Sequence, residues 1–311
     1  MEEIKREKFE ELYGKLYESM EEIKNNNGKR RNVEDTGLSY TRFTAMHGNR
    51  YWKDENGEEN NIRFMLVGRA VNGWGEYLGK NDSKESFVES SMANLTSDKK
   101  AFSKNQKDVK DRFEWIVTSE NDSPHNTFRE NIDKKEERTQ RGKYRLTGSP
   151  FWSYTKDIWD ILNNKKDSSW NERWFEKIAW TNLYKIAPTG YIEENGKRKT
   201  WGSNPNTTEC NEQIEVCREL LKEEIEYFKP THILMVIGED WFTDFRELFT
   251  NINDIGRNIN SGKNKNTVFL EKTAEYIKRD GNACKVAVVC RPETRPKEEY
   301  VNQVSNYFLN E

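Results

Sequence analysis

Residues able to bind or activate a ligand gather at four places where an apolar segment ends. They occupy residues 68–75, 182–188, 238–241 and 291–295, and they include glycines, two asparagines and three arginines. In α/β proteins, ligands collect outside the carboxyl ends of the parallel strands. If the four apolar segments are such strands, we expect these loops to meet at one edge of a sheet and to form one site.

The first loop, residues 68–75, reads GRAVNGWG. Its first two glycines are five positions apart, so it is neither the GxGxxG dinucleotide motif nor a GxxxxGK[ST] phosphate loop. A nicotinamide or ATP site is therefore not supported, and we expect no cofactor. Three glycines still let the backbone approach a flat ligand and point N–H groups at it. The alternative is a turn that only needs positive φ angles.

Asn182 and Arg291 are the polar groups that follow two of the other apolar segments. The carboxamide of Asn182 offers a donor and an acceptor side by side, a pair that can read the edge of a nucleobase. Its alternative role is to cap the following loop. Arg291, with Arg295 nearby, places a cation at the same edge of the expected sheet. Alternatively, this segment is only the solvated start of a helix.

Composition limits the classes of protein to which the chain can belong. Its 51 basic and 54 acidic residues do not suggest a protein that coats nucleic acid without regard to sequence, although a local basic groove remains compatible with them. Four cysteines without a CxxC provide neither a disulfide framework nor a metal-ligand set, and Cys210 and Cys217 are expected to be reduced thiols. No apolar run is long enough for a membrane span or a secretory signal. We expect a cytoplasmic protein that does not contact a membrane.

The elements that must position these loops follow from apolar periodicity. Helices are expected at residues 4–23, 149–162, 209–228 and 297–309, with shorter ones at 170–175 and 241–249. Strands are expected at 62–67, 178–184, 233–237, 267–270 and 285–290, a hairpin turn at 51–57, and a polar loop at 185–207. Ser149 is the expected cap of the helix that begins with Pro150.

Buried-type strands separated by helices indicate an α/β fold, a three-layer α/β/α arrangement around a mostly parallel sheet. Residues 1–311 are read as a single domain. Residues 1–60 form an N-terminal helix and extension, and residues 76–148 form a polar insertion. Scattered aromatic residues in that insertion, Phe102, Phe113, Trp115 and Phe128, suggest short helices held against the body.

Taken in chain order, these segments resemble the uracil-DNA glycosylase superfamily, particularly its compact bacterial and archaeal branches. The resemblance covers residues 62–75 and 149–308. FMLVGRA at 64–70 resembles the family's first motif, a strand that enters a loop of the GEAPG kind. TNLYK at 181–185, followed by Pro188, is similar to a family strand whose asparagine binds the pyrimidine edge. The helix, Lys-Pro and glycine-terminated strand of residues 209–238 keep the family's order, and RPE at 291–293 falls where the family carries HPS.

The departures from the family pattern fall on groups that do chemistry. Arg69 stands where the family has a carboxylate, and Arg291 where it has a histidine. Removal of a base from deoxyribose develops positive charge on the sugar and negative charge on the base. The site therefore needs an acceptor to orient water and a donor or cation for the base. Arg291 can supply the cation, and Asn72 and Glu76 are the candidates for orienting water. Because the N-terminal CxxC is absent, the iron–sulfur cluster of some branches is not expected.

The resemblance also implies a set of substrate-binding residues around the base. They are Gly68, Arg69, Ala70, Gly73, Trp74, Phe151, Trp152, Asn182 and Lys185. Phe151 or Trp152 can stack on an everted base, although aromatic residues at helical spacing also serve as core. Basic clusters at residues 29–31, 197–199 and 291–297 are expected to contact phosphates.

The implied function is recognition of a nucleobase in nucleic acid, with DNA preferred, and hydrolysis of its N-glycosidic bond. The alternative is a non-catalytic protein of the same fold that binds a nucleotide or nucleic acid. The two arginines favour that alternative, because a pair of cations suits a phosphate better than it suits activation of water. A third interpretation is an interaction role for the N-terminal helix and the polar insertion.

Overall fold

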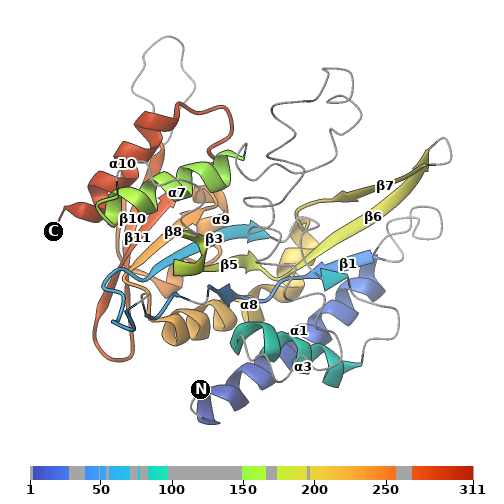
Figure 1. Cartoon of the computed structure of the whole chain (residues 1–311). Coiled ribbons are helices and arrows are strands. Elements are labelled where there is room, and N and C mark those ends of the chain that lie inside the picture. Colours follow the sequence, from blue (N-terminus) through green and yellow to red (C-terminus); the bar gives the residue numbers. More distant parts are fainter. Residues whose placement is uncertain are drawn as a thin grey trace.

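The computed structural model describes residues 3–27, 39–48, 50–53, 56–70, 76–77, 83–96, 149–165, 174–194, 197–256 and 268–310. Figure 1 labels the elements along the chain. The helices are α1 (Glu3–Asn27), α3 (Lys84–Thr96), α7 (Pro150–Leu162), α8 (Thr207–Phe228), α9 (Glu239–Thr243) and α10 (Lys297–Leu309), with 3-10 turns at Trp174–Lys177 and Arg246–Leu248. The strands are β1 (Ser39–Arg42), β2 (Met46–His47), β3 (Phe64–Ala70), β4 (Glu76–Tyr77), β5 (Ile178–Tyr184), β6 (Ile186–Glu194), β7 (Lys197–Gly202), β8 (His232–Val236), β9 (Thr250–Asp254), β10 (Leu270–Ile277) and β11 (Ala283–Val289).

The main sheet has seven strands in the order β2-β5-β3-β8-β11-β10-β9. Its four central strands, β5, β3, β8 and β11, run parallel, whereas β2, β10 and β9 pair antiparallel. The α/β class is confirmed, but the sheet is mixed and is parallel only at its centre. One physical reason is the short connection at residues 278–282 between β10 and β11. A parallel crossover needs a dozen or more residues, so these two strands pair antiparallel.

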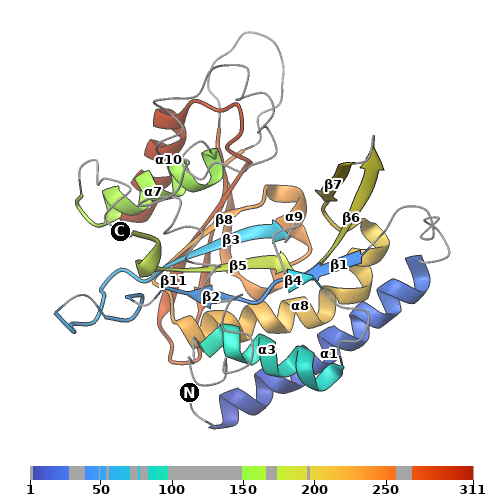
Figure 2. The ribbon, with the colours of Figure 1, turned by 45° about the vertical axis from the view of Figure 1, so that its right-hand side comes forward.

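Helices cover both faces of this sheet. In Figures 1 and 2, α1, α3 and α8 lie on one face, and α7 and α10 lie on the other. Alternation along β3 explains this arrangement, because Met65 and Val67 pack into the core under α1 and α8, while Phe64 and Leu66 pack into the core under α7 and α10. The expected three-layer arrangement is therefore confirmed.

The ends of the two helices that flank β5 are set by local sequence. Helix α8 begins with a capping box, in which Asn206 accepts from the N–H of Glu209 at 3.0 Å and Glu209 accepts from the N–H of Asn206 at 2.8 Å. It ends before Pro230. Helix α7 begins at Pro150, which has no N–H to satisfy. Ser149 is the N-cap residue, as predicted, although its side chain makes no capping hydrogen bond.

Residues 186–202 form a β-hairpin, so the expected polar loop at 185–207 was wrong. Strands β6 and β7 pair with each other, and β6 also pairs with β1 in a second sheet of order β4-β1-β6-β7. The hairpin projects beyond the ends of β3 and β5 (Figures 1 and 2) and carries the basic cluster of residues 197–199 on β7. Its pairing partner, residues 39–42, lies far away in the sequence, and strand formation that depends on such a partner leaves a weak local signal.

Several smaller predictions can also be compared with the fold. The hairpin turn at 51–57 is confirmed by a β-bridge between Lys53 and Glu59, with Gly57 at φ +82°. Part of the expected polar insertion belongs to the core, because Phe87 of α3 is buried together with residues of α1. The aromatic residues at 102, 113, 115 and 128 lie outside the described residues.

Candidate functional site

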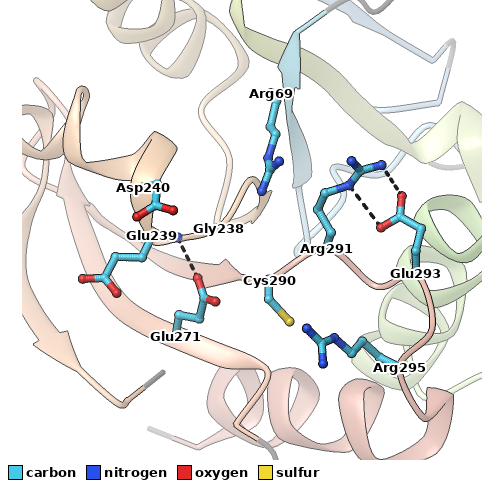
Figure 3. A pocket seen from close by; sticks show the side chains of 9 residues that line it. All are labelled: Arg69, Gly238, Glu239, Asp240, Glu271, Cys290, Arg291, Glu293 and Arg295. Atoms are coloured by element: carbon cyan, nitrogen blue, oxygen red, sulfur yellow. Dashed lines mark hydrogen bonds and ion pairs between the residues drawn. The ribbon is translucent and has the colours of Figure 1, made fainter. Parts of the chain in front are cut away.

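The order of the parallel strands creates a crevice between β3 and β8. After α7 the chain reaches β5 on one side of β3, and after α8 it enters β8 on the other side. Segments that leave neighbouring strands in opposite directions open a crevice at their carboxyl ends. A pocket of about 470 Å³ lies there (Figure 3), within the usual size range of small-molecule sites. Its lining residues are Arg69, Gly238, Glu239, Asp240, Glu271, Cys290, Arg291, Glu293 and Arg295.

Beside this pocket, Gly68, Asn182 and Phe151 come together. Strands β3 and β5 pair in parallel with Gly68 opposite Asn182. A Cβ atom at position 68 would lie only 2.2 Å from Oδ1 of Asn182 and 3.9 Å from Cζ of Phe151. Only glycine leaves room for the carboxamide at this place. The sequence counted these three residues among those expected around one base, and the structure places Gly68 against Asn182 with Phe151 nearby.

The carboxamide of Asn182 makes no hydrogen bond within the described part of the chain. Asn182 is 3% exposed as a residue, and its only hydrogen bonds in that part involve its main-chain oxygen. Its Oδ1 and Nδ2 are not among the fully enclosed polar atoms without a partner, so the carboxamide retains access to solvent or to a ligand. The alternative role as a loop cap is not observed, since the side chain of Gln213 accepts from the N–H groups of Lys185 and Ile186 instead, at 3.1 and 2.9 Å.

Lys185 lies in the interior and does not line the pocket. It is 0% exposed, and its Nζ donates to Thr181 Oγ1 at 2.5 Å, to the carbonyl oxygen of Asn182 at 2.8 Å and to Glu224 of α8 at 2.8 Å. Burial raises the pKa of Glu224, and the neighbouring Lys185 and Thr181 oppose that rise. Lys185 therefore fixes the main chain of Asn182 from within the protein, and the ligand contact expected of it is not available there.

Arg69 points to the other side of β3, toward the end of β8, because successive side chains of a strand alternate in direction. Its Nε donates to the carbonyl oxygen of Ile237 at 2.6 Å, and its guanidinium lies 5.5 Å from the ring centre of Trp241. Burial lowers the pKa of Arg69, and nearby Arg291 lowers it further. Gly238, at φ +77°, leaves space for this guanidinium, because a Cβ there would lie 3.1 Å from an Arg69 nitrogen.

Two further arginines enter the pocket from the segment after β11. Arg291 is exposed and forms a two-pronged ion pair with Glu293, at 2.6 and 3.2 Å. Arg295 is less exposed, and its Nε is buried without a hydrogen-bond partner. The sequence indicates Arg295 only as a neighbour of Arg291, yet among the described residues Arg295, like Arg69, forms no ion pair.

The pocket also contains carboxylates that no sequence pattern assigned to it. Glu271 accepts from the N–H of Glu239 at 2.6 Å, and Glu239 pairs with Lys272 at 2.8 Å. Asp240 has an interaction partner as well. Glu271 reaches this edge because β10 runs antiparallel and begins here, so only the direction of β10 could have identified it. Cys290 lies at the centre of the pocket, and burial raises its pKa to about 11, which keeps the thiol protonated.

The two aromatic candidates on α7 have different environments. Trp152 is 3% exposed and packs edge-on against Trp180 at 4.9 Å in the core. Trp152 is therefore a core residue, the alternative role given for these aromatic residues. Phe151 is only partly buried, lies edge-on to Trp152 at 5.0 Å and faces Gly68. Of the two rings, Phe151 is the one placed beside Asn182.

The remaining candidates are placed only in part. Ala70 ends β3 opposite Tyr184 and is partly buried. Glu76 belongs to β4, where its main chain pairs with Arg42 of the second sheet. Asn72, Gly73 and Trp74 lie outside the described residues, as does the basic cluster of residues 29–31.

Comparisons with known proteins add no family assignment. The chain matches no protein-family model, and no curated protein is significantly similar to it. Across the described ranges, no helix combines the length and apolar character needed to cross a membrane. The functional argument therefore rests on the geometry of the site.

Proposed function

We propose that this protein recognises a nucleobase, in nucleic acid or in a nucleotide, at the site formed by Gly68, Phe151 and Asn182. The observation that carries the proposal is the carboxamide of Asn182, a residue only 3% exposed at the carboxyl end of β5, which has no hydrogen-bond partner among the described residues. A ligand that reaches this carboxamide can make the hydrogen bonds that the described residues leave unmade.

The chemistry around Asn182 suits a flat heterocycle. Its carboxamide presents a donor and an acceptor together, which matches the paired acceptor and donor on the edge of a base. Phe151 supplies an aromatic ring, and stacking of a base on such a ring contributes about 1–3 kcal/mol. Gly68 has no side chain to obstruct a planar ligand. A base within a strand must leave its stack to reach such a site.

The order of the segments around the site is similar to that of the uracil-DNA glycosylase superfamily, which supports the same ligand class. Hydrolysis of the glycosidic bond needs, in addition, an acceptor that orients water. The side chains of Asn72 and Glu76 lie outside the described residues, and Arg69 places a cation where the family has a carboxylate. The described residues therefore support recognition, and hydrolysis is a separate outcome of the same experiment.

Fluorescence anisotropy with labelled oligonucleotides tests the proposal. Single- and double-stranded probes carry uracil, hypoxanthine or xanthine at one position, and matched probes carry an abasic analogue there. We expect the protein to bind at least one base-containing probe about tenfold more tightly than its abasic match, the value of one well-placed hydrogen-bonded contact. Asn182→Ala should abolish this preference. Asn302→Ala, which changes an exposed asparagine of α10, should preserve it.

The same mixtures, heated in alkali and separated on a denaturing gel, report hydrolysis as strand breaks at the modified base. Breaks that disappear in Asn182→Ala would extend the proposal to a glycosylase. A wild-type protein that binds every base-containing probe no better than its abasic match would overturn the proposal. So would an equal loss of preference in Asn182→Ala and Asn302→Ala.

A further inference from the structure

The pocket between β3, β8 and β11 contains two arginines that form no ion pair within the described part of the chain, although the carboxylates of Glu293, Glu271 and Asp240 lie near Arg69. We propose that Arg69 and Arg295 bind a phosphate group in this pocket. Both residues line the same cavity of about 470 Å³, and Figure 3 shows them approaching it from different segments, Arg69 from the end of β3 and Arg295 from the loop before α10.

Arg69 is held in place while much of its hydrogen-bonding capacity remains unused. Its Nε donates to the carbonyl oxygen of Ile237, and the ring of Trp241 lies against its guanidinium. No other hydrogen bond or ion pair involves Arg69 within the described ranges. In Figure 3 the guanidinium points toward Gly238 and Arg291. A fixed guanidinium with free N–H groups loses little conformational entropy when it binds an oxyanion.

Arg295 has a fixed main chain, and its side chain contacts the thiol of Cys290. Its carbonyl oxygen accepts from the hydroxyl of Tyr154 at 2.6 Å, and its N–H donates to the carbonyl oxygen of Pro292 at 3.1 Å. Its Nε is enclosed by protein and has no hydrogen-bond partner. Arg295 lines the pocket, where the terminal N–H groups of its guanidinium can donate to a phosphate oxygen.

The carboxylates that share the pocket already have other partners. Glu293 pairs with Arg291, Glu239 pairs with Lys272, and Glu271 accepts from a main-chain N–H. None of them forms an ion pair with Arg69 or Arg295. Arg279 lies at the turn between β10 and β11, outside the pocket. Its side chain is 54% exposed and pairs with Glu223, so Arg279 is a control for the two pocket arginines.

Phosphate fits this pair better than a simple halide does, because the planar guanidinium forms two parallel hydrogen bonds with the oxygens of a phosphate. The cavity is larger than one phosphate group. If a nucleobase occupies the neighbouring Asn182 site, which rests on the function proposed above, the ligand is a nucleotide. Its base and its phosphate would then lie on the two sides of the end of β3, next to Gly68 and Arg69 respectively.

Isothermal titration calorimetry and thermal shift on the full chain test this proposal. The probes are inorganic phosphate, chloride at matched ionic strength, deoxyuridine and deoxyuridine monophosphate. We expect phosphate to bind and to raise the melting temperature where chloride does not. Arg69→Gln and Arg295→Gln should each weaken phosphate binding roughly ten- to hundredfold, as expected for the loss of a charged hydrogen bond. Arg279→Gln, which removes an arginine outside the pocket, should change it by less than about threefold.

The variants separate this proposal from the nucleobase proposal. Asn182→Ala should leave phosphate binding unchanged. If phosphate binds but no nucleoside or base-containing probe does, the nucleobase proposal fails and the phosphate site stands. A wild-type protein that responds equally to phosphate and chloride overturns the phosphate site, and so does an equal loss in Arg279→Gln. If circular dichroism shows that Arg69→Gln is unfolded, phosphate binding by the wild-type protein and by Arg295→Gln tests the proposal.

Discussion

Two groups of charged residues lie at the same edge of the sheet and differ in burial and in ion pairing. Lys185 is fully buried, and its ammonium reaches Thr181, the main chain of Asn182 and the carboxylate of Glu224. Arg69 and Arg295 are partly buried and have no ion pair within the described part of the chain. The difference separates a charge that holds the fold from charges that remain available to a ligand.

The comparison also shows how the two roles are connected. Lys185 hydrogen-bonds the main chain of Asn182, and the side chain of Asn182 lies against Gly68. The buried ion pair of Lys185 and Glu224 thus fixes the end of β5, which carries the Asn182 carboxamide. A change to this pair should therefore act mainly on stability, whereas changes in the pocket lined by Arg69 and Arg295 should act mainly on ligand binding.

The largest effect is expected from Lys185→Met. It leaves the carboxylate of Glu224 buried without its cation, and removal of one partner of a buried pair costs about 3–5 kcal/mol. Urea denaturation measures this loss in the free energy of unfolding. The double variant Lys185→Met/Glu224→Leu, which removes both charges, should recover most of it. A loss below about 1 kcal/mol in the single variant would mean that Lys185 does not have the structural role assigned here.

A smaller effect on stability is expected when the pH falls, because His232, which lies far from the pocket, becomes protonated. Burial and nearby Lys285 lower the pKa of His232 at the start of β8 to about 4, from an ordinary value of 6.5. The unfolded chain therefore takes up this proton first as the pH falls. The contribution is fully present above pH 6.5 and is lost between pH 6.5 and 4, by roughly 3 kcal/mol at most.

Denaturation curves at pH 7, 5.5 and 4.5 measure this loss, and His232→Gln should flatten the pH dependence. The two pocket arginines stay charged throughout this range. A pH dependence that is the same in His232→Gln and in the wild-type protein would assign it to other groups.

Gly68→Ala should lower stability by about 1–3 kcal/mol, the usual cost of a side chain that does not fit. Its Cβ would lie 2.2 Å from Oδ1 of Asn182, so the carboxamide must move and base discrimination should be lost. In the Asn182→Ala background the same substitution should cost less, because its steric partner is gone. Equal costs in the two backgrounds would show that the clash with Asn182 does not determine the effect.

The smallest effect on stability is expected from Arg291→Gln. Its ion pair with Glu293 is exposed, with 54% of the Arg291 side chain accessible, and such pairs contribute about 0–1 kcal/mol. Thermal denaturation of Arg291→Gln and of Lys185→Met compares the stability lost when an exposed ion pair is removed with that lost when a buried one is removed. A loss as large as that of Lys185→Met would remove the distinction on which the comparison depends.

The core of the fold could be predicted because its signals are local. The strands β3, β5, β8 and β11 are apolar runs, typical of strands buried on both faces, and α8 has its own capping residues. The hairpin β6–β7 was missed because its polar sequence pairs with β1, which lies more than a hundred residues earlier.

The candidate site could be predicted only in outline. The sequence counted Gly68, Asn182 and either Phe151 or Trp152 among the residues expected around one base, and the structure places Gly68 against Asn182 with Phe151 nearby. It could not separate Lys185 from Arg69, because the difference depends on Glu224, a partner that reaches Lys185 from α8. Nor could it place Glu271, which reaches the pocket only because β10 runs antiparallel.

The most direct test of the central claim observes the side-chain amide of Asn182 itself. We would record ¹H–¹⁵N correlation spectra of the full chain and assign the Asn182 side-chain amide as the signal that is lost in Asn182→Ala. The protein is then titrated with nucleoside monophosphates whose bases are uracil, hypoxanthine or xanthine. We predict that at least one ligand shifts the Asn182 side-chain signals as its base forms hydrogen bonds, while those of Asn302 stay in place. Signals of Asn182 that do not move with any of these ligands would contradict the account.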